Sequence, residues 1–112
     1  MDIDGRFWLK RQGYTFVGPG RIQLLERIRD SGSINEAAKS MKMSYKAAWD
    51  MVDAMNRVAA RPVVVRIKGG RSGGGTQLTE YGQTLIDSFR NMEQEHRDFL
   101  NALNTKYAIA LI

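Results

Sequence analysis

The feature that most constrains the fold is the stretch from Ser33 to Asn56, SINEAAKSMKMSYKAAWDMVDAMN, which predicts two helices joined by a tight turn. Ser33 followed three residues later by Glu36 is the reciprocal capping arrangement of a helix start, so the first helix should begin at Ile34. Ser44 offers a second N-cap, from which the next helix should run. Two short helices so closely joined must bury their apolar faces against each other and a third element.

The second helix has one apolar stripe and a polar N-terminal end. Its apolar residues recur at three- and four-residue steps, as in Ala48, Met51, Val52 and Met55. An exposed polar helix end of this kind is typical of a recognition helix in the DNA major groove. The candidate DNA-binding residues here are Ser33, Ser44, Tyr45, Lys46, Trp49 and Asp50, although Trp49 is also placed to seal the core. The alternative is an ordinary pair of core helices.

The charge distribution favours a polyanion partner for this part of the chain. Residues 1–79 carry fourteen Lys or Arg against seven Asp or Glu, and residues 80–112 carry three against five. The net charges are therefore +7 and −2, so the basic character is concentrated around the helical pair, as a DNA-binding surface requires. The chain has no cysteine, no apolar run long enough to span a membrane and an acidic N-terminus, which together favour a cytoplasmic protein.

Before the helical pair, the sequence predicts a β-hairpin and a first helix. Residues 5–17 alternate apolar and polar side chains on either side of a Gln12-Gly13 turn, although Arg6 to Trp8 is also compatible with a helix start. Pro19 precedes a helix from Arg21 to Asp30. The core-facing stripe of that helix should be Ile22, Leu24, Leu25 and Ile28.

After the helical pair, the sequence predicts a two-stranded wing over residues 62–79. The strand VVVRIK should point Val63, Val65 and Ile67 inward and Arg66 and Lys68 to solvent. A glycine-rich tip follows, in which Arg71 and Ser72 are placed to approach a phosphate or the minor groove. A nucleotide-binding P-loop explains these glycines less well than a wing tip does, because Gly75 stands where that motif needs lysine before Thr76.

The last segment predicts a long helix over residues 80–104, capped by Thr79. Its apolar positions step by three and four, which is typical of two helices packed side by side in a dimer. The alternative is a helix that folds back on its own domain. The expected dimerisation residues are Leu85, Phe89, Met92, His96, Phe99 and Leu103, with His96 packed in the seam rather than acting as a ligand.

Together these elements predict one winged helix-turn-helix domain over residues 1–112, mainly α-helical with a small β wing. Its helix-turn-helix should cover residues 33–59. The most specific runs, MSYKAAWD from Met43 and the wing Gly69 to Thr79, closely resemble the N-terminal DNA-binding domain of the ModE family of molybdate-responsive transcriptional regulators, and more distantly that of LysR-type regulators. The chain ends at Ile112 without a molybdate-binding domain, so, if complete, it resembles the single-domain form.

One departure from the usual pattern is Lys42, which occupies the tight turn where many helix-turn-helix proteins place glycine. A left-handed residue there would be strained, or the turn is built differently.

The function expected from these observations is sequence-specific binding of double-stranded DNA as a homodimer on an inverted repeat, with molybdenum-related genes as the targets that the resemblance implies. The alternative is a protein-interaction or non-specific DNA-binding module without an effector site of its own. Catalysis is not expected, because the carboxylates of Glu93, Glu95 and Asp98 share one solvated helix face with arginines. We expect no cofactor, no metal and no small-molecule site.

Overall fold

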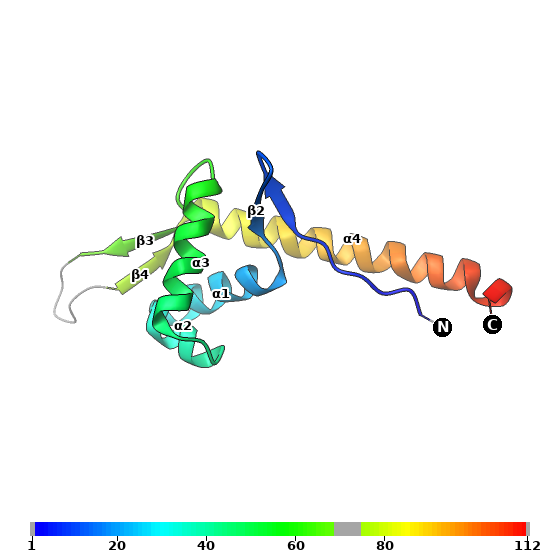
Figure 1. Ribbon diagram of the computed structural model, residues 1–112, viewed down its shortest axis with the longest axis horizontal. Coiled ribbons are helices and arrows are strands. Elements are labelled where there is room, and N and C mark those ends of the chain that lie inside the picture. Colours follow the sequence, from blue (N-terminus) through cyan, green and yellow to red (C-terminus); the bar gives the residue numbers. More distant parts are fainter. Residues whose placement is uncertain (1, 69–74, 112) are drawn as a thin grey trace.

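The computed structural model describes residues 2–68 and 75–111, without the side chains of 109–111. Its elements follow one another as β1 (Leu9–Arg11), β2 (Tyr14–Val17), α1 (Pro19–Ser31), α2 (Ile34–Ser40), α3 (Tyr45–Val58), β3 (Val64–Ile67), β4 (Gly75–Leu78) and α4 (Glu80–Leu111) (Figure 1). Strands β1 and β2 form one antiparallel hairpin and strands β3 and β4 form the other, the wing. The predicted class, mainly α with small β-hairpins and a long last helix, is confirmed.

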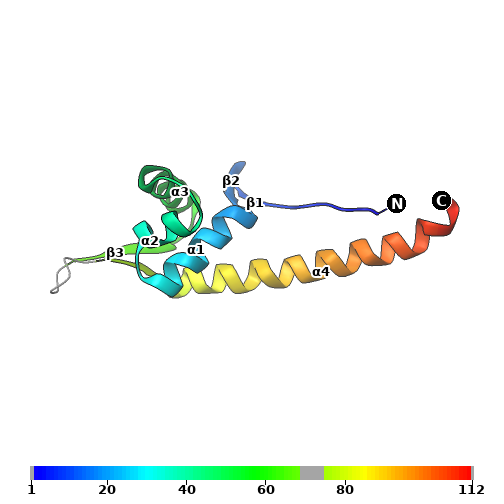
Figure 2. The same cartoon turned by 90° about the horizontal axis from the view of Figure 1, so that it is seen from below.

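The described part has an elongated shape, measuring 63 × 29 × 21 Å. Helices α1, α2 and α3 and the β1–β2 hairpin gather over the first half of α4, and the wing projects beyond the start of that helix. The second half of α4 extends past the other elements in the opposite direction (Figure 2). The N-terminal segment runs back along that second half, where the Asn104 side-chain amide donates to the Ile3 carbonyl over 3.1 Å and accepts from the Ile3 N–H. The chain therefore divides into a compact domain and a helical extension.

The core lies between α1, α3 and the first half of α4. The stripe predicted for α1 is confirmed, because all four of its residues are fully buried. Helix α1 ends at Gly32, whose left-handed φ of 68° allows its N–H to bond to the Ile28 carbonyl. In α3, Ala48, Val52 and Met55 have no exposed surface, and Met51 is half-buried. These packed faces hold the helix-turn-helix in a fixed orientation.

Local sequence signals set the tight turns. Gln12 and Gly13 have φ values of 52° and 84°, as a two-residue hairpin turn requires. Lys42 also adopts a left-handed φ, of 55°, so the strained form of the α2–α3 turn is the one that occurs. The Met43 N–H closes this turn on the Ala38 carbonyl over 3.0 Å.

The side-chain directions predicted for the first wing strand are confirmed for Val63, Arg66 and Lys68 and were wrong for Val65 and Ile67. Val63 and Val64 are both buried, whereas Val65 and Ile67 are exposed. The strand is fixed by Asn56, whose side chain accepts from the Val63 N–H over 2.8 Å and donates to the Val64 carbonyl over 3.1 Å. This contact between α3 and the strand sets which residues point inward, and the run of three valines carries no alternation that could have revealed it.

The seam predicted for the last helix divides into two parts. Leu85 and Phe89 are buried in the core of their own domain, so they are not available to a partner, contrary to the prediction. The helix begins as predicted, with the Gly82 N–H donating to Thr79 Oγ1 over 2.9 Å, but it extends to Leu111. His96 is packed by the N-terminal segment, with its ring edge-on to Phe7 at 5.2 Å between centroids.

A charged cluster on α4 marks the end of its packed half. Arg90 reaches across to Glu26 on α1, with Nε 3.1 Å from Oε2, and also contacts Glu93 one turn further along α4. The hydrogen bonds to these carboxylates raise the pKa of the Arg90 guanidinium well above its usual range. Beyond this cluster, Met92, Phe99 and Tyr107 are exposed.

Candidate nucleic-acid interface

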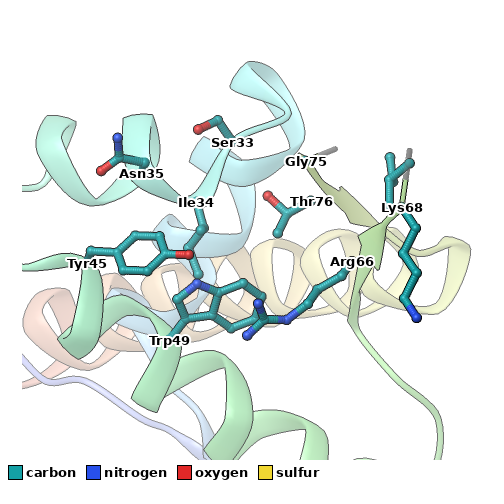
Figure 3. Close-up of a pocket in the computed structure, with 10 residues that line it drawn as sticks. Ser33, Ile34, Asn35, Tyr45, Trp49, Arg66, Lys68, Gly75 and Thr76 are labelled. Atoms are coloured by element: carbon teal, nitrogen blue, oxygen red, sulfur yellow. The ribbon is translucent and has the colours of Figure 1, made fainter. Parts of the chain in front are cut away.

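A cavity of about 440 Å³ opens between the start of α3, the start of α2 and the two wing strands (Figure 3). We call it the wing cleft. Five residues predicted to bind DNA line it, namely Ser33, Tyr45, Trp49, Arg66 and Lys68. They come from three different elements, so the fold brings together side chains that lie up to 35 positions apart in the sequence. The wing cleft is therefore a composite site of the helix-turn-helix and the wing.

The two predicted serine caps hold the helix starts of the site. Ser33 Oγ accepts from the Glu36 N–H over 3.2 Å, and Ser44 Oγ accepts from the Ala47 N–H over 3.0 Å. Only half of the predicted reciprocal arrangement forms at α2. The Ser33 N–H donates instead to Ser31 Oγ over 3.2 Å, and the Glu36 carboxylate lies 3.8 Å from the Lys39 ammonium group. The caps thus fix where α2 and α3 begin.

A cation–π contact links α3 to the wing. The Arg66 guanidinium lies over the Trp49 ring, 3.6 Å from its centroid, as Figure 3 shows. The edge of Trp49 in turn meets the Tyr45 ring at 6.4 Å between centroids. Trp49 is half-buried and packs against the core, so the sealing role considered for it is confirmed, whereas its contact with DNA stays a prediction.

Two buried polar atoms at the wing cleft have no hydrogen-bond partner within residues 2–68 and 75–108. They are Trp49 Nε1 and Thr76 Oγ1. Thr76 is only 4% exposed, and it pairs with Arg66 across the wing strands. Buried donors are normally satisfied, because each one left alone costs roughly 1–3 kcal/mol. An indole N–H, a hydroxyl and two cationic side chains in one cavity suit an anionic ligand with several acceptor oxygens.

Lys46 and Asp50 lie beside the cleft, on the outer face of α3. Lys46 Nζ is 2.9 Å from Asp50 Oδ2, one helical turn away, and both side chains are largely exposed. The hydrogen bond to this carboxylate, together with its charge, raises the pKa of the Lys46 ammonium group. An exposed ion pair of this kind contributes little to stability, so either side chain can readily leave the other for a new partner.

The remaining predicted DNA-binding residues, Arg71 and Ser72, fall in the stretch 69–74, outside the described residues. Sequence reasoning missed five residues of the cleft, namely Ile34, Asn35, Ile67, Gly75 and Thr76. Thr76 carried a usable signal, since it faces Arg66 once the hairpin is paired about its glycine tip. Asn56 was also missed, because its role depends on a contact between helix and strand.

The described part of the chain offers neither a metal site nor a membrane-spanning helix. Within those residues, no group of three or more His, Cys, Asp or Glu side chains is arranged to hold a metal ion. The same residues contain no helix that is both long and apolar enough to cross a membrane.

Comparison with known proteins identifies the family. The model for bacterial regulatory helix-turn-helix proteins of the lysR family matches residues 20–83, more than half of the chain. The chain belongs to this family. Helices α2 and α3, the wing and all of α1 except its first residue lie within the matched segment, so the wing cleft is built entirely from the LysR-type domain.

Named relatives point to one branch of regulators. The chain is 50% identical over 92 residues to the molybdenum transport protein ModE of Azotobacter vinelandii, covering 82% of this chain and 34% of that protein. It is 41% identical over 103 residues to the DNA-binding transcriptional dual regulator ModE of Escherichia coli K12, covering 92% of this chain and 39% of the relative. The chain thus spans little more than a third of the length of these relatives.

Solved structures support the LysR-type fold. Full-length LysG from Corynebacterium glutamicum superposes with a TM-score of 0.56 at 23% identity, covering 82% of this chain and 30% of that one. A MarR family protein from Bacillus stearothermophilus gives the same TM-score at 24% identity, covering 78% of this chain and 59% of that one.

Proposed function

We propose that the chain is a cytoplasmic, DNA-binding transcriptional regulator that reads its operator through α3 and grips the DNA backbone through the wing cleft. The chemistry of the wing cleft is the main support for this function. Its two donors without a partner among the described residues and its two cations fit the non-bridging oxygens of a phosphodiester, the anionic group of the DNA backbone.

Base recognition then falls to the outer face of α3. Lys46 can exchange its Asp50 partner for guanine O6 and N7, and the released Asp50 carboxylate can accept from cytosine N4. Tyr45 is half exposed and adjoins this pair, where it can contact a thymine methyl group or a sugar. We propose that the residues of the wing cleft set affinity, whereas Lys46 and Asp50 set sequence preference. The protein acts by binding and catalyses no reaction.

We expect the protein to function as a homodimer because of the second half of α4. Met92, Phe99, Leu103 and Tyr107 follow one another at steps of seven, four and four, and all but the half-buried Leu103 are exposed in the single chain. An exposed apolar stripe of this kind is typical of a surface that another protein chain covers. We propose that two copies pair along it and present two α3 helices to successive major grooves, about 34 Å apart.

Molybdenum-related genes are the proposed targets, because the chain is 50% and 41% identical to two ModE relatives, one of them named as a molybdenum transport protein. The test is selection of bound duplexes from a random-sequence library by the purified chain, repeated at raised salt. We expect an inverted repeat whose half-sites lie one helical turn apart, with retention falling steeply as salt rises. Salt-insensitive retention, or retention of all sequences alike, would support the interaction-module or non-specific alternative instead.

The dimer has its own test in sedimentation velocity. Phe99→Glu places a charge in the exposed stripe and should convert the dimer to a monomer without unfolding the compact domain, because Phe99 is 60% exposed in the single chain. A wild-type protein that sediments as a monomer at micromolar concentration would contradict the proposed assembly.

A further inference from the structure

The turn of the β1–β2 hairpin packs against the far end of α3, opposite the wing. Arg11 Nη1 donates to the Val58 carbonyl at that end over 2.7 Å. A second cavity, of about 270 Å³, opens beside this contact and is lined by Arg11, Gln12, Tyr14, Arg57 and Val58. We call it the hairpin cleft. It lies outside the site described above, and its hairpin precedes the segment matched by the LysR-family model, which begins at residue 20.

The hairpin cleft lies at the end of the outer face of α3. Lys46, Asp50, Asp53 and Arg57 recur at steps of four, three and four, so they share one face of the helix, and all are exposed. The hairpin rises beside α3 on the same side of the molecule, with α4 on the opposite side (Figure 2). The face proposed to read bases is thus bounded by the wing cleft at one end and the hairpin cleft at the other.

The groups in the hairpin cleft suit an anion. Its lining contains no acidic residue, and Arg57 has no carboxylate within salt-bridge distance in the described part of the chain. Arg11 places its charge on a terminal carbonyl of α3, which offsets the partial negative charge of the helix end. Tyr14 is 70% exposed, so its hydroxyl is free to donate, and the left-handed turn holds Gln12 at the rim.

On the basis of the DNA-binding function above, we propose that the hairpin cleft binds a phosphodiester on the DNA strand across the major groove from the wing cleft. The major groove is about 12 Å wide and α3, with 14 residues, is roughly 20 Å long, so a backbone strand passes each end of a helix laid in the groove. Arg57 supplies the charge, and Tyr14 and Gln12 supply further donors. The β1–β2 hairpin is then a second wing.

The test uses a duplex selected by the protein itself, with single phosphates replaced one at a time by neutral methylphosphonates. In each half-site, the wild-type protein should lose affinity at two clusters of phosphates on opposite sides of the major groove. Arg57→Gln should weaken binding roughly tenfold and abolish the sensitivity of one cluster only. Lys68→Gln should abolish the sensitivity of the other, and Tyr14→Phe should give a smaller loss at the same phosphates as Arg57→Gln.

The matched control is Arg97→Gln, which removes an exposed arginine from the second half of α4 and should leave both clusters sensitive. If Arg57→Gln binds and responds like Arg97→Gln while the wing-side cluster persists, the hairpin contact is overturned and the proposed function stands. If no duplex is selected, or no phosphate is sensitive, the proposed function fails and the hairpin contact fails with it. Thermal unfolding of each variant excludes loss of fold as the cause.

Discussion

The two faces of α3 differ in burial, and this difference separates folding from the proposed recognition of DNA. Ala48, Val52 and Met55 on the inner face have no exposed surface, whereas Lys46 and Asp50 on the outer face are mostly in solvent. The inner face needs only apolar volume that fills its space, and the outer face needs particular donors and acceptors. Substitutions on the inner face should therefore change stability, and substitutions on the outer face should change binding.

The largest effect should come from the inner face. Met55→Ala removes a fully buried side chain and leaves a cavity, so the free energy of unfolding should fall by about 2–5 kcal/mol. Urea denaturation followed by circular dichroism measures this loss. Affinity for the selected duplex, corrected for the folded fraction, should stay close to the wild-type value. A loss well below 1 kcal/mol would show that this face is not part of the core.

A smaller, purely functional effect should come from the outer face. Lys46→Ala removes a donor from a base-reading position, so affinity for the selected duplex should fall about tenfold, with a smaller loss on shuffled sequence. Fluorescence anisotropy with both duplexes measures the two losses. Lys106→Ala removes the same charge from the second half of α4 and is the control. Equal losses on both duplexes would assign Lys46 to the backbone rather than to bases.

The smallest effect on stability and DNA affinity should come from Thr76, the β4 residue in the wing cleft. Thr76→Val keeps the shape of a buried residue and removes a hydroxyl that has no partner among the described residues, so stability should hold or rise by up to about 1 kcal/mol. DNA affinity should fall a few-fold, because the wing cleft loses one donor to the phosphate. Thr76→Ser keeps the hydroxyl and should keep the affinity. A clear loss of stability in Thr76→Val would mean that the hydroxyl has a structural role.

How much of this could be predicted from the sequence depended on whether the determining contacts were local. The helix starts at Ser33 and Ser44 and the Gln12-Gly13 turn follow from hydrogen bonds and dihedral angles within a few residues, and they formed as expected. The periodicity of the last helix was also visible. Periodicity cannot tell whether a stripe packs on its own domain or on a partner, however, and so Leu85 and Phe89 were assigned to the wrong contact.

The misplaced parts of the site depended on long-range contacts. The direction of β3 is fixed by Asn56, and the place of Thr76 in the wing cleft is fixed by its pairing with Arg66. Both contacts join segments whose relative position is set only when the wing closes on α3. The sequence therefore indicated reliably which residues supply charges and donors at the candidate interface. It did not indicate where the wing places their side chains.

The central claim is that the outer face of α3 reads bases in the major groove. The most direct measurement replaces purines of the selected duplex, one at a time, with their 7-deaza analogues, which lack the N7 acceptor of the major groove and leave the minor groove unchanged. We expect affinity to fall at two short runs of positions about one helical turn apart, and Lys46→Ala to lose sensitivity at one position in each run. Undiminished affinity at every position, in a protein that still binds the duplex, would contradict the claim.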